Sequence, residues 1–202
     1  MGKTNQYIIP WYKKHIQTLG DVGLLGFSNN NLFEGDLYDL SIKNWDINNA
    51  WTLKQKYDTL ICTRCAYFSK DPSYFISRCW DHLNDGGKLY VDWGLGDHWR
   101  FSDYKIGWKK NGEQEYAYKK NNFLWSTVWD EELLTDSEFK LFSERVSKFG
   151  YKNLKNAILE EVPHIITFDE IKKFFKISYN TISLWEDLPQ FYILLSLTKL
   201  NN

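Results

Sequence analysis

The sequence predicts an α/β protein with a mainly parallel sheet, a C-terminal antiparallel hairpin and an aromatic-rich β insertion. Residues 57–94 show strand, helix and strand patterns in succession, which together form a βαβ unit. Residues 180–197 contain two apolar runs separated by a turn at 186–189, a pattern typical of an antiparallel hairpin. Residues 97–134 alternate aromatic and polar side chains around Asn111-Gly112, a dipeptide that favours a hairpin turn.

The part of the chain before the βαβ unit begins with a helix pattern. Between residues 6 and 19 apolar side chains recur near helical spacing, interrupted by Pro10. The short apolar run 22–27 is followed by polar residues, which predicts a buried strand and then a turn. Residues 32–37 predict a second short strand.

Within the βαβ unit, residues 59–63 form a near-continuous apolar run suited to a central parallel strand. The helix that follows begins near Pro72, because proline is favoured in a first helical turn, and its apolar face ends at 85–87. The next strand is expected over residues 88–93. Further helix patterns cover residues 136–149 and 167–176.

The bulk composition favours one domain spanning residues 1–202, with 97–134 as a lid-like insertion. A formal net charge of -1 and a pI near 6.4 differ from the basic footprint of a duplex-DNA binder. The chain shows no signal-peptide run and no apolar stretch long enough to span a membrane. Its three cysteines are an odd number, which favours a reduced, cytoplasmic setting.

Several motifs resemble class I S-adenosylmethionine-dependent methyltransferases. Tyr57-Asp58 before one strand and Asp85-Gly86-Gly87 before the next resemble the flanks of that family's fourth and fifth strands. The C-terminal hairpin is similar to the family's reversed sixth and seventh strands. Glu34-Gly35-Asp36-Leu37 resembles its Gly-Asp-apolar step, where the acid and the next backbone N–H meet the adenine. The resemblance implies a Rossmann-like sheet with helices on both faces, S-adenosylmethionine as cofactor and S-adenosylhomocysteine as product.

The resemblance places the family's glycine-rich motif at residues 21–29, where the usual acid followed by Gly-x-Gly is not intact. Glycines here could bring the backbone close to the cofactor, and a strand-to-helix turn would offer free N–H groups to its carboxylate. The link to Thr59 is shorter than in the family, so some elements are missing and no acid is placed for the ribose. The expected cofactor-binding residues are Gly23, Gly26, Phe27, Ser28, Asn29, Asp36, Leu37, Thr63 and Arg64.

The densest cluster of polar chemistry follows the second strand of the βαβ unit, at residues 92–100. Methyl transfer is an in-line displacement that needs mainly proximity, orientation and sometimes a base, and acids and a histidine offer that base. The expected catalytic residues are Asp92, His98 and Arg100, and the expected substrate-binding residues are Tyr67, Trp93, Trp99 and Trp108. The alternative for this cluster is a turn with an N-capping aspartate and packed tryptophans.

The favoured function is therefore a methyltransferase acting on a small molecule or an exposed group, with no membrane and an open oligomeric state. One alternative is a catalytically inactive methyltransferase-fold module with a binding or regulatory role. Another is a single-stranded nucleic-acid binder that uses the aromatic insertion, which the near-neutral charge disfavours. Cys62-x2-Cys65 and Cys79-x2-His82 have zinc-like spacing, but Cys62 and Cys79 lie on apolar faces, so no metal is expected.

Overall fold

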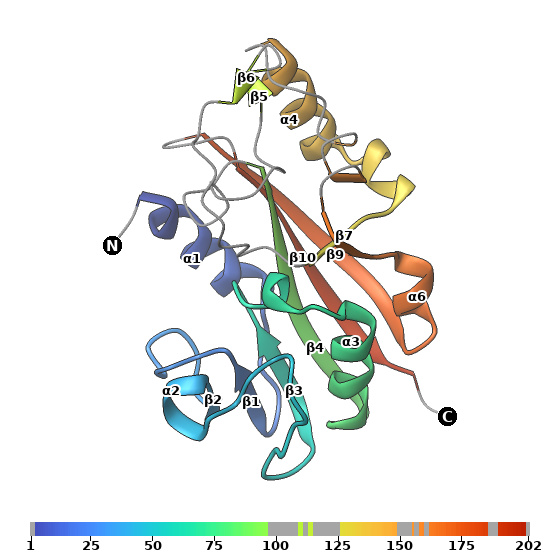
Figure 1. Ribbon diagram of the computed structural model, residues 1–202. Coiled ribbons are helices and arrows are strands. Elements are labelled where there is room, and N and C mark those ends of the chain that lie inside the picture. Colours follow the sequence, from blue (N-terminus) through green and yellow to red (C-terminus); the bar gives the residue numbers. More distant parts are fainter. Residues whose placement is uncertain are drawn as a thin grey trace.

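The computed structural model describes residues 3–96, 109–110, 113–114, 126–148, 155, 158–159, 162–185 and 190–200. A six-stranded sheet with the order β2-β1-β3-β4-β10-β9 forms its centre (Figure 1). The strands are β1 (Val22–Leu25), β2 (Asp36–Tyr38), β3 (Tyr57–Cys62), β4 (Leu83–Gly96), β9 (Phe175–Leu184) and β10 (Gln190–Lys199).

The strand directions confirm the predicted fold class. Parallel ladders join β1 to β2, β1 to β3 and β3 to β4, while β10 runs antiparallel to both β4 and β9. Because the chain passes from β1 to β2 on one side and returns to β3 on the other, the sheet has a switch point between β1 and β3. This is a Rossmann-like mixed sheet that ends in an antiparallel pair.

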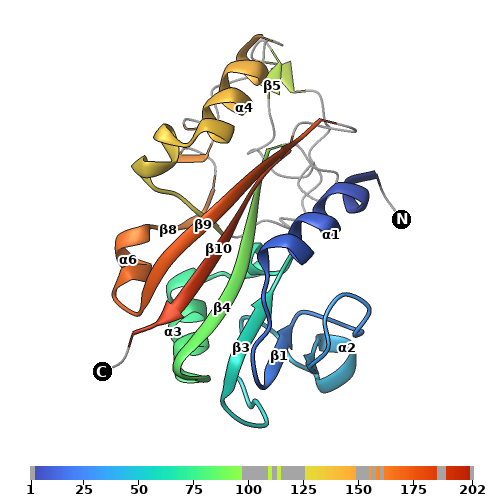
Figure 2. The ribbon, with the colours of Figure 1, turned by 180° about the vertical axis from the view of Figure 1, so that it is seen from behind.

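Helices cover both faces of the sheet, as the prediction required (Figures 1 and 2). Helix α1 packs on one face, and α3, α4 and α6 pack on the other. The helices are α1 (Lys3–His15), α2 (Leu40–Lys43), α3 (Pro72–Asp81), α4 (Ser137–Lys148) and α6 (Phe168–Lys172), with 3-10 turns η1 (Ala66–Phe68) and η2 (Glu131–Thr135).

The position of β3 in the sheet explains the near-continuous apolar run in its sequence. Leu60 and Cys62 face the core shared with α3 and α4, whereas Ile61 between them faces the core shared with α1. Successive side chains of a strand point to opposite faces, so a strand covered on both sides needs apolar residues at every position. Burial on both faces therefore fixes β3 at the middle of the molecule.

Helix ends follow the capping signals of the sequence. The Asp71 side chain accepts a hydrogen bond from the Tyr74 N–H at the start of α3, with Pro72 in the first turn. Thr167 and Glu170 form a capping box at the start of α6. The helix predicted over 167–176 ends at Lys172, because the chain enters the long strand β9 shortly afterwards.

Two other boundaries differ from the predictions. The strand expected at residue 88 begins at Leu83, and its pairing with β3 shifts register between Tyr57 and Thr59. Gly86 adopts a positive φ of 72° in this irregular stretch, which a glycine tolerates without strain. The second difference lies in residues 26–35, which link the parallel strands β1 and β2 without a helix. The polar turn predicted after β1 is present, but no helix follows it to offer free N–H groups to a carboxylate.

Within the described residues, four short strands lie outside the main sheet. Strands β5 (Lys109–Lys110) and β6 (Glu113–Gln114) pair antiparallel on either side of 111–112, where the sequence predicts a hairpin turn. Strands β7 (Ser126–Val128) and β8 (His164–Ile166) pair in parallel. The rest of 97–125 lies outside the described residues.

Candidate functional site

A cavity of about 540 Å³ opens where β1, β2 and β3 end, and we call it the carboxyl-edge cavity. It lies beside the switch point of the sheet, which is where open α/β sheets bind their ligands. The residues that line it are Gly26, Asp39, Leu40, Trp45, Asp46, Ile47, Asn48, Arg64, Cys65, Phe68 and Lys70. The set combines carboxylates, basic groups and aromatic rings.

Two left-handed turns form the floor of the carboxyl-edge cavity. Gly26 follows β1 with a φ of 77°, and a Cβ at this position would lie 2.5 Å from the Cys65 Sγ. Arg64 follows β3 with a φ of 57°, which is uncommon for a residue with a side chain. Its backbone N–H donates a hydrogen bond of 2.5 Å to Asp92 Oδ1, and this bond helps to hold the turn.

Asp92 lies beneath this floor, buried in β4 with 1% of its surface exposed. Its second carboxylate oxygen accepts a hydrogen bond from the Tyr12 hydroxyl of α1. Burial raises the pKa of Asp92 to about 6, against the hydrogen bonds from Tyr12 and Arg64, which lower it. Asp92 does not line the carboxyl-edge cavity. Its hydrogen bonds instead connect α1 and the Arg64 turn to strand β4.

The Arg64 side chain makes a direct link to α1, in addition to the link through Asp92 and Tyr12. Its Nη1 donates a hydrogen bond of 2.5 Å to Asn5 Oδ1 near the start of that helix. The apolar face of α1 is anchored on the sheet by Ile8 and Tyr12, both almost fully buried. Helix α1 is therefore fixed at two polar points beside the cavity as well as by its packing.

The opposite wall of the cavity comes from the residues after β2. Asp39 caps α2. Its Oδ1 accepts a hydrogen bond of 2.9 Å from the Ser41 N–H and one of 2.5 Å from the Ser41 hydroxyl. Among the described residues Oδ2 of Asp39 accepts none, so it remains available to a ligand. Asn48 belongs to the same wall. Its side chain donates a hydrogen bond to the Phe68 carbonyl and accepts one from the Lys70 N–H.

Trp45 lines the same cavity with only 7% of its surface exposed. Its ring packs on Trp51 with the centroids 5.2 Å apart. The indole Nε1–H has no hydrogen-bond acceptor within the described part of the chain. Because that atom is itself buried, a molecule in the cavity does not reach it, and Trp45 contributes packing to the wall of the cavity.

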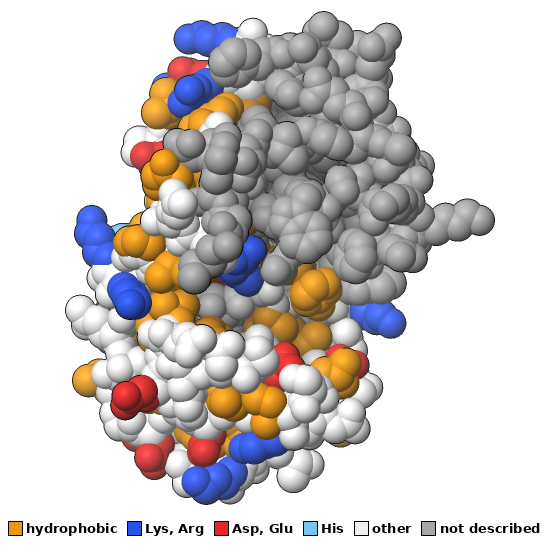
Figure 3. Space-filling view, turned by 90° about the vertical axis from the view of Figure 1, so that its left-hand side faces the viewer, with side chains coloured by type: hydrophobic (Ala, Val, Ile, Leu, Met, Phe, Trp, Pro, Cys, Tyr) orange, Lys and Arg blue, Asp and Glu red, His pale blue; other side chains and the backbone are white. Residues whose placement is uncertain are grey.

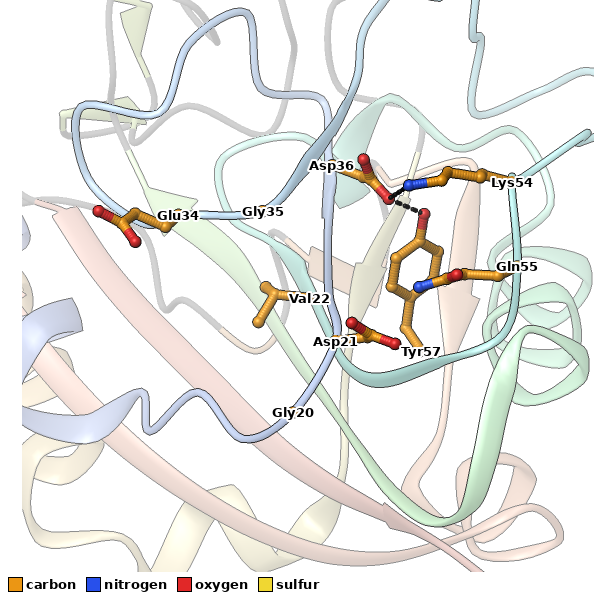
Figure 4. Close-up of a pocket in the computed structure, with 9 residues that line it drawn as sticks. All are labelled: Gly20, Asp21, Val22, Glu34, Gly35, Asp36, Lys54, Gln55 and Tyr57. Atoms are coloured by element: carbon orange, nitrogen blue, oxygen red, sulfur yellow. Dashed lines mark hydrogen bonds and ion pairs between the residues drawn. The ribbon is translucent and has the colours of Figure 1, made fainter.

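A second cavity, of about 340 Å³, lies at the opposite edge of the sheet, where β1, β2 and β3 begin (Figure 4). Asp36 belongs to this amino-edge cavity, where its carboxylate points toward Lys54 and accepts a hydrogen bond of 2.8 Å from the Tyr57 hydroxyl (Figure 4). That hydrogen bond is the main cause of the lowered pKa of Asp36. Asp36 is thus not brought together with Gly26 and Arg64, and Leu37 packs against the core that holds α1.

The remaining residues predicted to bind cofactor are spread around the end of β1 and β3. Gly23 lies inside β1, where a Cβ would lie 2.7 Å from the Leu60 side chain, so it serves strand packing. Phe27 packs on Phe33 and is partly buried. The others take different places: Ser28 and Asn29 in an exposed turn, and Thr63 buried after β3. Of the predicted set, only Gly26 and Arg64 line the carboxyl-edge cavity.

Besides Asp92, the residues predicted to bind substrate or to catalyse fall into two groups. Tyr67 and Trp93 are buried in the main core, and the Trp93 Nε1 lies 3.5 Å from the Ser126 hydroxyl. Neither lines the carboxyl-edge cavity. His98, Trp99, Arg100 and Trp108 lie outside the described residues.

Sequence reasoning missed several residues of the cavity, above all Asp39 and Trp45. The prediction placed the second strand over 32–37, which put Asp36 near its end. The strand in fact begins at Asp36 and ends at Tyr38, so the acid at its carboxyl end is Asp39. A capping signal in the sequence points to Asp39, because an aspartate directly before a short helical segment is a favoured N-cap residue.

The zinc-like spacing does not assemble a metal site. Cys62 and Cys79 are fully buried, and burial raises the pKa of both thiols. The His82 Nδ1 is occupied by the Arg78 carbonyl at 2.8 Å. In the part of the chain that the structure describes, no three His, Cys, Asp or Glu side chains are grouped to hold a metal ion. No described helix has the length and apolar character needed to cross a membrane.

No family model matches the sequence, and no curated protein matches it either. Solved structures of methyltransferases do match the fold. An S-adenosylmethionine-dependent methyltransferase from Clostridium acetobutylicum has 12% identity and a TM-score of 0.44, with 98% of this chain and 91% of that chain covered. One from Thermotoga maritima has 12% identity and a TM-score of 0.42, covering 98% and 96%. N-methyltransferase NodS from Bradyrhizobium japonicum, solved with S-adenosyl-L-homocysteine, has 9% identity and a TM-score of 0.41, covering 96% and 84%.

The fold and the cavity define the class of the molecule: a Rossmann-like α/β protein with a ligand-sized cavity at the switch point of its sheet. In structure the chain is similar to S-adenosylmethionine-dependent methyltransferases over nearly its full length, at low sequence identity.

Proposed function

We propose that the chain binds S-adenosylmethionine in the carboxyl-edge cavity and transfers its methyl group to a small molecule or an exposed group. The observation that carries the proposal is the position of the cavity at the switch point between β1 and β3. Its volume of about 540 Å³ falls within the range of sites for ligands of this size.

The chemistry of the cavity lining fits the cofactor. Asp39 follows β2 with a free Oδ2, which suits a ribose diol, and Arg64 offers a cation to the methionine carboxylate. Trp45 and Phe68 supply ring surface for the adenine. The left-handed turn at Gly26 lets the backbone at the end of β1 pass close to the ligand.

S-adenosylmethionine, when bound, supplies an activated methyl group, so the protein needs to orient the reactants and exclude water. Asp92 contributes by holding the Arg64 turn and Tyr12 of α1, and not by contact with the cavity. His98 and Arg100 remain predictions as catalytic residues after β4, with His98 as a candidate base.

A catalytically silent binding module is the second candidate, and two observations favour it. The link between β1 and β2 contains no helix, so a cofactor carboxylate has no helix N-terminus there. Asp92, the acid expected as a base, has both carboxylate oxygens occupied by hydrogen bonds, one buried and one partly buried. Single-stranded nucleic acid is less favoured, because basic and acidic side chains are interspersed over the described part of the face in Figure 3.

Thermal unfolding with S-adenosylmethionine and with S-adenosylhomocysteine tests the proposal. Ligand at about one hundred times its dissociation constant stabilises the folded state by about 2.7 kcal/mol, so the melting temperature should rise. Adenosine alone, which lacks the methionine, is the matched control and should give a smaller rise. No rise with either ligand at millimolar concentration contradicts cofactor binding. Binding without transfer of a labelled methyl group to any acceptor supports the silent module.

A further inference from the structure

Helix α1 carries a polar side chain on the face that packs on the sheet. Asn5, Ile8 and Tyr12 recur at helical spacing, so they share one face of the helix. Ile8 and Tyr12 are almost fully buried in the core that α1 forms with the sheet, and Asn5 itself is half-buried. The packing of the two apolar residues therefore fixes the place of the first helical turn, to which Asn5 belongs.

From this position the Asn5 side chain holds the guanidinium of Arg64. Its Oδ1 accepts a hydrogen bond of 2.5 Å from Arg64 Nη1. The backbone of Arg64 is held separately, because its N–H donates to the buried carboxylate of Asp92. A long arginine side chain has many rotamers, and a contact that fixes it in the free protein removes an ordering cost from ligand binding.

The partner of the guanidinium is uncharged, which leaves the arginine able to bind an anion. Asn5 occupies one of several N–H donors without neutralising the positive charge of Arg64. Within the part of the chain that the structure describes, no salt bridge takes up that charge. The same cavity is lined by Asp39 and Asp46, which repel a ligand carboxylate. The position of Arg64 thus decides where a carboxylate is accepted.

We propose that Asn5 is a positioning residue, which fixes the Arg64 guanidinium so that the carboxyl-edge cavity favours a nucleoside carrying a carboxylate over the bare nucleoside. The inference rests on the proposed function, because it concerns the amino-acid end of the ligand. Asn5 does not line the cavity and acts only through Arg64.

Calorimetry on the full-length chain with two ligands tests the proposal. S-adenosylhomocysteine has the carboxylate, whereas 5′-methylthioadenosine keeps the nucleoside and the thioether but lacks it. Asn5→Ala should weaken binding of S-adenosylhomocysteine about fivefold, since the freed arginine side chain must then be ordered by the ligand, and should leave binding of 5′-methylthioadenosine unchanged. Gln6→Ala changes an exposed residue of the same helical turn and is the matched control, with both affinities unchanged.

Asn5→Asp separates positioning of the arginine from a merely structural role. Aspartate keeps an acceptor for Arg64 and is favoured in a first helical turn, so α1 should stay in place. Its negative charge forms an ion pair with the guanidinium and competes with the carboxylate of the ligand. We therefore expect S-adenosylhomocysteine to bind Asn5→Asp at least as weakly as Asn5→Ala, with 5′-methylthioadenosine again unaffected.

The proposal is wrong if Asn5→Ala leaves binding of S-adenosylhomocysteine unchanged or weakens both ligands equally. It is also wrong if Asn5→Asp keeps full affinity for S-adenosylhomocysteine, or if the wild type binds the two ligands equally well. In all of these cases the nucleoside still binds, so the proposed function stands. If the wild type binds neither ligand, the proposed function and this inference are both wrong.

Discussion

The buried carboxylate of Asp92 makes the stability of the protein depend on pH, and Asp92→Asn should remove that dependence. The side chain is 1% exposed in the middle of β4 and accepts hydrogen bonds from Tyr12 and from the Arg64 backbone. Burial raises its pKa from 3.8 to about 6 despite these two bonds. The folded state therefore binds a proton more tightly than the unfolded state does.

The sign and size of the effect follow from this difference in pKa. Since the folded pKa is the higher one, stability from Asp92 is greatest when the carboxyl is protonated and is lost as pH rises through about 6. A change from 3.8 to about 6 corresponds to about 3 kcal/mol in total. Between pH 4.5 and pH 7 the loss is about 2 kcal/mol, because protonation is already incomplete at pH 4.5 in the unfolded chain.

Urea unfolding of the wild type and of Asp92→Asn, followed by circular dichroism across this pH range, gives the measurement. The contributions of other titrating groups cancel when the free energies of unfolding of the two proteins are subtracted. This difference should change by about 2 kcal/mol in favour of the variant as pH rises. Asp58→Asn is the matched control. Hydrogen bonds from Asn84 and the Asp21 backbone lower the Asp58 pKa below 3.8, so its stabilisation is lost only in stronger acid and its difference should stay nearly flat between pH 4.5 and pH 7. A difference for Asp92→Asn that is flat with pH would refute the reasoning.

Three further substitutions test the local structure by urea unfolding at pH 7. Tyr12→Phe removes the hydroxyl that donates a hydrogen bond to Asp92 and should lower the free energy of unfolding by about 1.5–3 kcal/mol. A loss that is just as large at pH 4.5 would contradict a hydrogen bond to an ionised carboxylate. Gly26→Ala should cost about 2 kcal/mol or more, because the φ of 77° and the Cys65 sulfur both oppose a Cβ, and a neutral substitution would show that the turn is different. Thr167→Ala should cost about 1 kcal/mol through loss of the capping box with Glu170, whereas no change would mean that the box is not formed.

Long, regular patterns in the sequence predicted their elements well. The apolar runs of β3 and β10 have many residues in one pattern, and most of those residues are buried. Strand β9, at the edge of the sheet, is only partly buried. Helix α4 likewise buries Phe139, Phe142 and Val146 at helical spacing. These elements depend mainly on which faces they bury, which periodicity reports directly.

Short elements and long-range contacts were harder to predict. Strand β2 has three residues, too few for periodicity to define its ends, and this displaced the expected acid from Asp39 to Asp36. Asp92 has the chemistry of a base, but its partners Tyr12 and Arg64 are distant in sequence and are set by packing alone. Periodicity cannot reveal that a polar residue is buried and already paired.

The central claim is that the ligand binds at the carboxyl edge of the sheet, and one pair of matched variants tests it most directly. Asp39→Asn alters the carboxyl-edge cavity, while Asp36→Asn makes the same chemical change at the amino edge. Calorimetry with S-adenosylhomocysteine should show about tenfold weaker binding by Asp39→Asn, which is a loss of about 1.4 kcal/mol, and unchanged binding by Asp36→Asn. Weaker binding by Asp36→Asn with Asp39→Asn unaffected would contradict the account and place the ligand at the opposite edge.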